Sequence, residues 1–335
     1  MPKPTLSSSL GVGPMSAETV EAVFRFSHFR RKQLMLIASK NQVDYKGGYV
    51  NNWTTAQYME FVRQMRKDYP NSDVLICRDH CGPGFNGIDD LADVYATIEE
   101  DIKQGFDLIH IDFCHFKGNR EQMLAESKKA IEHCLKLNPD ILLEIGTDEN
   151  AGTKYSVSNL REIEEELDYF KAFCSPELYV VQTGTLVGEI NQIGNQNLKF
   201  AKEVGDMLRS KGVKLKEHNA DYLPLADIKA RSGVVDAMNI APQLGVVQTT
   251  TLLAKCLIYG INYQPFLDLV YSGGKWKKWM HTNGPENKML CFLIAGHYHF
   301  ASPEYRQIVS QLKESEDIKE TFISSLTDVL NHYIQ

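Results

Sequence analysis

The sequence predicts a (β/α)8 TIM barrel with a C-terminal helical extension. Six apolar segments of strand length each end in a polar residue, and they follow one another at intervals of 21 to 38 residues. A strand with its crossover helix takes about 30 residues, so this is the interval of a repeating βα unit. The 335 residues suffice for one barrel of about 250 residues and an extension. The six polar residues are His80, Asp112, Glu144, Gln182, His218 and Asn239.

Eight strand patterns alternate with helical patterns, as a barrel requires. The expected strands are 10–15, 33–39, 74–80, 107–113, 141–146, 178–184, 213–219 and 235–241. The expected helices are 16–28, 54–68, 88–104, 120–137, 157–173, 196–211, 225–231 and 244–259. Ser16 is a residue type that caps helix N-termini, which supports the start of the first helix.

After Gly260 the alternation stops. Four further helices are expected, over 264–271, 287–299, 303–314 and 317–333. We therefore predict two parts, a barrel over residues 1–262 and a helical extension over 263–335. The extension is expected to pack on the barrel or on a partner subunit.

The composition argues against a nucleic-acid-binding, membrane or secreted disulfide-rich protein. The net charge of −7 argues against nucleic acid or an anionic membrane as a partner, and no apolar run is long enough to cross a bilayer. The first residues, MPKPTLSSSLGVGPMS, lack the apolar stretch of a signal peptide. Seven cysteines, an odd number, form no closed disulfide framework. We expect reduced thiols in a cytoplasmic protein.

The strand ends predict a polar site, because in a barrel they converge on one mouth. Asp79 and His80 end the third strand, and the turn CGPG after them allows both side chains to reach the mouth. His218 ends the seventh strand. Two histidines with carboxylates suit a divalent transition metal, so we assign His80 and His218 as ligands and Asp79 as an acid/base. The alternative is a buried Asp–His hydrogen bond or a satisfied core histidine.

Asp112 and Glu144 are assigned to metal binding or acid/base work, since a carboxylate in a barrel mouth needs a partner. The alternative is an ion pair with Lys40, Arg78 or Lys216. The candidate substrate-binding residues are Asn41, Gln182, Asp221, Asn239, Lys275 and Lys278. The two lysines lie in a basic aromatic loop, which either grips a phosphate or is merely solvated. Four other histidines, His110, His115, His297 and His299, are assigned structural or surface roles.

Several segments resemble the tagatose-bisphosphate aldolase accessory-subunit family. CRDHCGPG (77–84) resembles the family's GGDHLGPN, and LIHIDFC (108–114) its KIHLDAS. KEHNADYL (216–223) resembles YEAHSTDYQ, and the longer stretch over 36–62 resembles SNQVxxxGGYTGMTPADFxxFV. The matches follow the same order over most of the chain.

The family is similar to class II ketose-bisphosphate aldolases, which are zinc-dependent barrels. The resemblance implies that Asp79 is the acid/base, that His80 and His218 bind metal, and that Asp112 and Glu144 are alternative or second-site ligands. Gln182 stands where true aldolases carry a third metal histidine, so it is assigned as a metal ligand, with a hydrogen bond to a substrate hydroxyl as the alternative. Zinc is expected, with manganese or nickel as alternatives.

Three functions remain open at this stage. The first is a metal-dependent enzyme that makes or breaks the C3–C4 bond of a ketose or ketose phosphate, with the metal as Lewis acid. The second is a ketose 4-epimerase that uses the same cleavage and re-addition. The third is a non-catalytic subunit that stabilises an aldolase partner. A small-molecule sugar or sugar phosphate is the expected ligand, with a homo-oligomer or an aldolase subunit as the protein partner. A kinase is disfavoured, because no GxxxxGK[ST] loop is present.

Overall fold

The computed structural model describes residues 4–147, 159–281 and 287–334. Eight parallel strands among these residues form a closed barrel, which confirms the predicted fold. The strands are β1 Leu10–Val12, β2 Gln33–Ser39, β3 Asp73–Cys81, β4 Leu108–Ile111, β5 Leu142–Thr147, β6 Leu178–Val181, β9 Lys214–Glu217 and β10 Ala237–Ile240. They pair in chain order, and β1 closes the barrel by pairing with β10.

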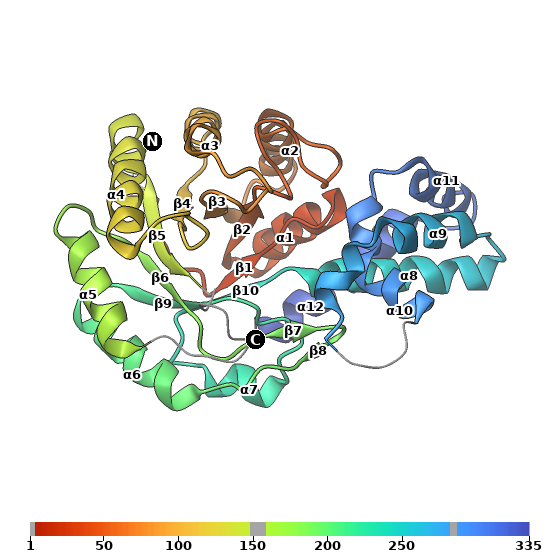
Figure 1. The fold of residues 1–335 in the computed structure, drawn as a ribbon. Helices are drawn as coiled ribbons and strands as arrows, with labels where there is room; N and C mark the ends of the chain where they lie inside the picture. Colours follow the sequence, from red (N-terminus) through yellow and green to blue (C-terminus); the bar gives the residue numbers. More distant parts are fainter. Residues whose placement is uncertain (1–3, 148–158, 282–286, 335) are drawn as a thin grey trace.

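Helices alternate with the strands and surround them (Figure 1). They are α1 Ala17–Arg30, α2 Thr55–Asp68, α3 Leu91–Gln104, α4 Arg120–Leu137, α5 Leu160–Lys171, α6 Leu198–Ser210 and α7 Leu225–Ala230. The first begins where predicted, because the Ser16 side chain accepts a hydrogen bond from Thr19 N. Thr54 and Asn119 form capping boxes at the starts of α2 and α4.

The barrel interior is layered. Side chains two residues apart on a strand face the same side, so alternate positions fill the interior. An apolar cluster lies inside, made of Leu6, Met35, Ile37, Leu75, Cys77, Leu108, Leu142, Leu178 and Ala237. The residues two positions beyond Cys77, Leu108 and Leu142 are polar. The strands therefore carry an apolar floor beneath a polar layer.

Helices also make up most of the described residues after β10. These are α8 Pro242–Tyr259, α9 Gln264–Gly273, the 3₁₀ helix η1 Lys275–Trp279, α10 Lys288–Ala295, the 3₁₀ helix η2 Gly296–His299, α11 Pro303–Leu312 and α12 Ile318–Tyr333. α9, α10 and α11 lie with α8 to one side of the barrel (Figure 1). A second apolar core holds this group together, with Leu252, Phe266 and Phe292 among its buried members.

The last helix, α12, returns to the barrel. It contacts α1, α7 and α8, and so occupies a place in the outer ring between α7 and α1 (Figure 1). Its residues Ile323, Leu326 and Leu330 belong to the barrel's own core. The Tyr333 hydroxyl donates to the carbonyl of Ala220, 2.8 Å away, in the loop after β9. The helices that follow Gly260 thus divide between two cores.

Three observations complete the fold. A short antiparallel hairpin, β7 Val187–Gly188 and β8 Asn191–Gln192, lies in the loop after β6 and was not predicted. The first residues of the predicted helix 157–173 fall outside the described residues. All seven cysteines are free thiols, and no described helix is long and apolar enough to span a membrane.

Candidate active site

A distortion at the end of β3 brings two neighbouring side chains to one cavity. The pairing of β3 with β4 shifts register between Arg78 and Cys81, and His80 adopts a left-handed backbone with φ of 48°. Asp79 and His80 therefore both line the cavity, although adjacent residues of a regular strand face opposite sides. Gly82 follows, and a Cβ there would lie 1.6 Å from the Asp112 carbonyl oxygen. The turn therefore requires glycine at that position.

Four side chains from four strands meet in the polar layer above the barrel floor. They are Asp79, His110, Glu144 and His218, and one potential ligand atom of each lies within 4.8 Å of the others. Asp79 Oδ1 is 3.3 Å from His110 Nδ1 and 3.8 Å from His218 Nε2. Glu144 Oε1 is 3.5 Å from His218 Nε2 and 3.6 Å from His110 Nδ1. All four are buried.

His80 is positioned by a carboxylate behind it. Its Nδ1 lies 2.8 Å from Asp112 Oδ2, which also accepts a hydrogen bond from the Thr147 hydroxyl. The other oxygen, Asp112 Oδ1, accepts from Cys114 N. A carboxylate on one ring nitrogen fixes the tautomer, and it leaves the other nitrogen able to act as a ligand. His80 Nε2 lies 3.8 Å from Asp79 Oδ2, at the edge of the cluster.

The carboxylates of the cluster are held in their ionised form by neighbouring basic groups. Lys216 Nζ pairs with Glu144 Oε2 at 2.7 Å, and both side chains are fully buried. Burial opposes ionisation of Glu144, but Lys216 and then His110 lower its pKa below the usual range. For Asp79, the neighbouring His80 and His218 outweigh the effect of burial and lower the pKa strongly.

These groups fit a divalent cation. The three carboxylates of Asp79, Asp112 and Glu144 face one ammonium, that of Lys216, so the remaining charge is balanced either by protonated histidines or by a bound cation. Glu144 Oε1 is buried and has no hydrogen-bond partner within the described part of the chain. Buried charges require a partner or a metal, and imidazole with carboxylate ligands suits zinc and similar ions.

The alternative expectation, that Asp112 and Glu144 form ion pairs with Lys40, Arg78 or Lys216, holds for one of the two carboxylates. Lys216 does pair with Glu144, as one alternative expected. Lys40 and Arg78 instead pair with Asp93 and Asp101 of α3, away from the mouth. Asp112 is paired with His80 rather than with a cation.

The cluster opens into a cavity of about 670 Å³. The residues that line it include most of the predicted site: Asn41, Asp79, His80, His218, Asp221, Asn239, Lys275 and Lys278. Asn239 is buried, and neither atom of its amide has a hydrogen-bond partner in the described residues. An unpaired buried amide is unfavourable, so its position at the cavity indicates that it meets a ligand.

The other predicted substrate-binding residues already have partners. The Asn41 amide donates to the Phe85 carbonyl. Asp221 Oδ1 accepts hydrogen bonds from Ala241 N and Gln243 N, both at 2.9 Å, at the start of α8. Burial raises the pKa of Asp221 to about 7, although these backbone bonds act to lower it. Asp221 therefore holds the first turn of α8 as well as lining the cavity.

Gln182 and Glu144 are not among the cavity-lining residues. Gln182 Oε1 accepts a hydrogen bond from Gly184 N at 2.7 Å, within the loop after β6. Glu144 lies beneath the cavity, in contact range of His218. The structure thus brings Asp79, Glu144 and His218 together, places His80 and Asp112 beside them, and leaves Gln182 in its own loop.

The extension supplies one wall of the cavity. Lys275, Lys278 and Trp279 from η1 line it, together with Tyr298 and His299 from η2. Lys278 Nζ lies 4.3 Å from the ring centroid of Trp279. The hairpin after β6 secures this wall, because Glu189 N donates to the Trp279 carbonyl at 2.8 Å.

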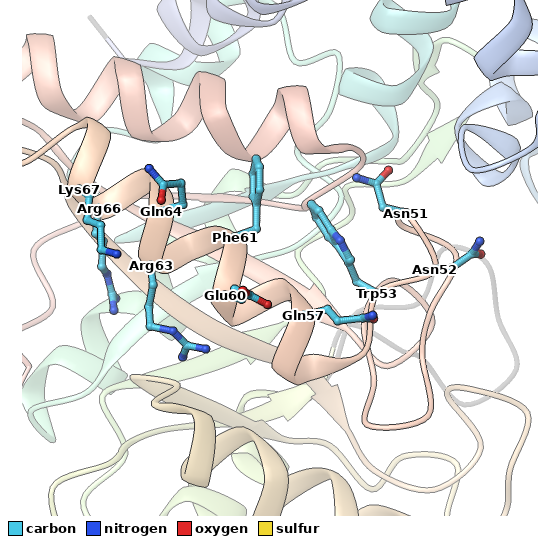
Figure 2. A pocket seen from close by; sticks show the side chains of 10 residues that line it. All are labelled: Asn51, Asn52, Trp53, Gln57, Glu60, Phe61, Arg63, Gln64, Arg66 and Lys67. Carbon is cyan, nitrogen blue, oxygen red and sulfur yellow. The ribbon is translucent and has the colours of Figure 1, made fainter.

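A second, larger hollow of about 1000 Å³ lies on the outside of the barrel. Figure 2 shows that its side chains come from α2 and the loop that leads into it. They include Trp53, Phe61, Arg63, Arg66 and Lys67. It brings together neither a histidine nor several carboxylates, so we place the chemistry in the barrel mouth.

Two members of the site were missed in the sequence. His110 was assigned a structural role because it lies within a strand rather than at its end. Its spacing from Asp112 was the available signal, since residues i and i+2 face the same side. Lys216 has the same relation to His218, and it appeared only as an alternative partner.

The fold and this polar mouth define a (β/α)8 barrel with a candidate metal site at the strand ends. The structure resembles a probable tagatose 6 phosphate kinase from Sinorhizobium meliloti 1021, with a TM-score of 0.81, 17% identity and coverage of 97% of this chain and 98% of that chain. It resembles the fructose-bisphosphate aldolase of Campylobacter jejuni, with a TM-score of 0.60, 13% identity and coverage of 97% of this chain and 90% of that chain. It also resembles the YdjI aldolase of Escherichia coli K12, with a TM-score of 0.53, 14% identity and coverage of 92% of this chain and 94% of that chain. At such identities the likeness shows a shared fold.

A family model gives the more particular result. Residues 10–135 match the family described as D-tagatose-1,6-bisphosphate aldolase subunit GatZ/KbaZ-like. The resemblance found in the sequence is therefore confirmed over this part of the chain, which includes Asp79, His80, His110 and Asp112. The chain thus shares its fold with aldolases, and residues 10–135 resemble this family in sequence.

Proposed function

We propose that the protein is a metal-dependent enzyme that cleaves and re-forms the C3–C4 bond of a ketose or ketose phosphate. The observation that carries this proposal is the buried cluster of two carboxylates and two histidines, Asp79, His110, Glu144 and His218, at the foot of a cavity. A purely structural barrel gains little from a cluster of buried carboxylates. The family match and the aldolase fold neighbours agree with this class of reaction.

His110, His218, Glu144 and His80 would hold the divalent ion. When bound, the ion would act as a Lewis acid on the substrate carbonyl and stabilise negative charge on the three-carbon side. Asp112 would keep the His80 ring in one orientation through its 2.8 Å contact. Lys216 would hold Glu144 in place by the same kind of contact.

Asp79 would act as the general base. It would take the proton from the C4 hydroxyl, C4 would become an aldehyde, and the electron pair of the C3–C4 bond would pass to C3. The position of Asp79, at the cavity surface and between His80, His110 and His218, supports this role. Its lowered pKa keeps it ionised, as a general base must be before it takes the proton. The unpaired Asn239 amide would bind a substrate oxygen.

A 4-epimerase is the second candidate. If the aldehyde stays in the cavity, rotates and adds again to C3, the product is the C4 epimer. The enclosing wall formed by η1 and η2 favours this outcome, because it would retain the released fragment. The same residues serve both reactions, with Asp79 returning its proton to the new hydroxyl.

A non-catalytic subunit is the third candidate. Two observations favour it: the match to an aldolase subunit family, and the engagement of Gln182 with its own loop. In that case the partner would be a catalytic aldolase subunit. The buried cluster argues against it, because a stabilising subunit does not need a metal-binding group of residues.

Product analysis separates the three functions. The metal-loaded protein would be incubated with free ketohexoses and their phosphates, and the products followed by chromatography and NMR. Release of a three-carbon fragment supports the aldolase, and a C4 epimer alone supports the epimerase. If neither the free ketohexoses nor their phosphates are consumed, and the protein raises the activity of an added aldolase, the accessory-subunit function is supported.

A further inference from the structure

The cationic wall of the cavity lies on a single short helix. η1 has five residues and is preceded by Gly274, which adopts a left-handed φ of 67°. In a 3₁₀ helix the side chains of residues i and i+3 eclipse each other. Lys275 and Lys278 therefore lie on the same side, and both line the cavity. Lys277 is not among the lining residues, and its Nζ lies 5.7 Å from the ring centroid of Trp276.

The two lysines are positively charged and unneutralised. Within the described residues, neither forms an ion pair with a carboxylate. Lys278 Nζ instead lies over aromatic faces, 4.3 Å from the Trp279 centroid and 5.9 Å from that of Tyr298. Cation–π contacts position an ammonium without cancelling its charge. The wall is thus set to receive an anion.

A third donor stands beside them. His299 lines the cavity, and its Nε2 is buried with no hydrogen-bond partner among the described residues. Burial, assisted by the nearby Lys275, lowers the pKa of His299, so its ring is neutral at pH 7. A neutral imidazole still offers one N–H donor. Two ammonium groups and one N–H match the three peripheral oxygens of a phosphate.

The other ionisable groups that the described residues bring to the cavity include carboxyl groups but no further ammonium or guanidinium group. Among the described residues, no arginine and no lysine other than Lys275 and Lys278 lines the cavity, whereas Asp79 and Asp221 do. The pKa of Asp79 is lowered, so this group is a carboxylate. A second phosphate placed beside Asp79 would face that carboxylate, and like charges repel.

We infer that η1 and His299 bind one terminal phosphate, so the substrate class is ketose monophosphates, not bisphosphates. The sugar part of this inference rests on the proposed function, whereas the phosphate part rests only on the wall. Lysine binds phosphate as a point charge. The wall offers three donors, which equals the number of peripheral oxygens of a phosphate, whereas the carboxylate of a sugar acid has two oxygens.

Measurements of ligand binding test the single-phosphate inference without requiring turnover. Isothermal titration of the metal-free and metal-loaded protein would use inorganic phosphate, a free ketohexose, a ketohexose 6-phosphate and a ketohexose 1,6-bisphosphate. One variant combines Lys275→Gln and Lys278→Gln. The control variant carries Lys277→Gln on the same helix. The double variant should weaken binding of the 6-phosphate by about tenfold or more, since hydrogen bonds to charged groups are worth about 1.5–3 kcal/mol. Lys277→Gln should change it less than twofold.

Four outcomes of this titration would contradict the inference. Bisphosphate binding more than tenfold tighter than 6-phosphate binding would overturn the single-phosphate assignment. So would equal affinity of parent and double variant, equal effects of the double variant and the control, or no binding of any phosphate. If the protein binds no metal and shows no turnover but still binds phosphate, the phosphate site at η1 and His299 is supported. Only the proposed reaction is then contradicted.

Discussion

At the scale of single residues, Asp79 decides whether the mouth is catalytic. We predict that Asp79→Asn retains metal and loses turnover by about 10²–10⁴-fold, the usual contribution of a general base. Asn is nearly isosteric, and His110, Glu144 and His218 remain to hold the ion. Steady-state kinetics at matched metal occupancy measures the loss. A variant with the parental rate would show that Asp79 is structural.

Asp221 gives a prediction about pH. Its folded pKa of about 7 lies above the ordinary 3.8, so the fold favours the protonated form. Stability from this group is fully present below pH 4 and is lost as the pH rises towards 7. Asp221→Asn removes this dependence but keeps an acceptor for Ala241 N and Gln243 N. The variant should therefore gain stability over the parent between pH 4 and 7, by at most about 1.4 kcal/mol per pH unit.

Urea unfolding of both proteins across this range is the measurement. Other titrating groups are common to the two chains, so they cancel in the difference. A difference that stays constant with pH, or that shrinks as the pH rises, would place the Asp221 pKa near its ordinary value.

The predictability of the site follows from strand geometry. Asp79, His80, Asp112 and His218 were found because they stand at strand ends, where a barrel places its chemistry. His110 was missed because a histidine inside an apolar strand reads as a core residue. Which partner each carboxylate takes could not be predicted either, since it depends on distances between strands far apart in the sequence.

At the scale of elements, local signals predicted most of the fold. Apolar runs of strand length predicted the barrel strands, and the cap residue Ser16 predicted the start of the first helix. The β7–β8 hairpin was missed, because two-residue strands leave no periodic pattern. The position of α12 was also beyond the sequence, since its apolar stripe fits any apolar surface.

The place of α12 in the outer ring leads to a stability prediction. Leu330 is 0% exposed within the barrel core, so Leu330→Ala should cost about 2–5 kcal/mol of unfolding free energy. Leu257 at the end of α8 is 63% exposed, and Leu257→Ala should change stability by no more than about 0.5 kcal/mol. Urea denaturation compares the two. Equal effects would mean that α12 does not complete the barrel.

At the scale of the whole molecule, the site belongs to both parts of the chain. The barrel supplies the cluster and the floor, and the extension supplies η1 and η2 as a wall. The sequence predicted a barrel at 1–262 and an extension at 263–335, and this boundary stays a prediction. It offered no means to tell that Tyr298 and His299 come to the mouth, because nothing local links η2 to the strand ends.

The central claim is that the buried cluster binds a divalent cation. Equilibrium metal binding, measured on the demetallated parent and on variants, tests it most directly. We predict about one ion per chain for the parent, and affinity at least about tenfold weaker in His80→Ala, His110→Ala and His218→Ala. Gln182→Ala should change the affinity less than any of these, because Gln182 is bonded to its own loop. A parent that binds no divalent cation, or histidine variants that bind it as the parent does, would contradict the account.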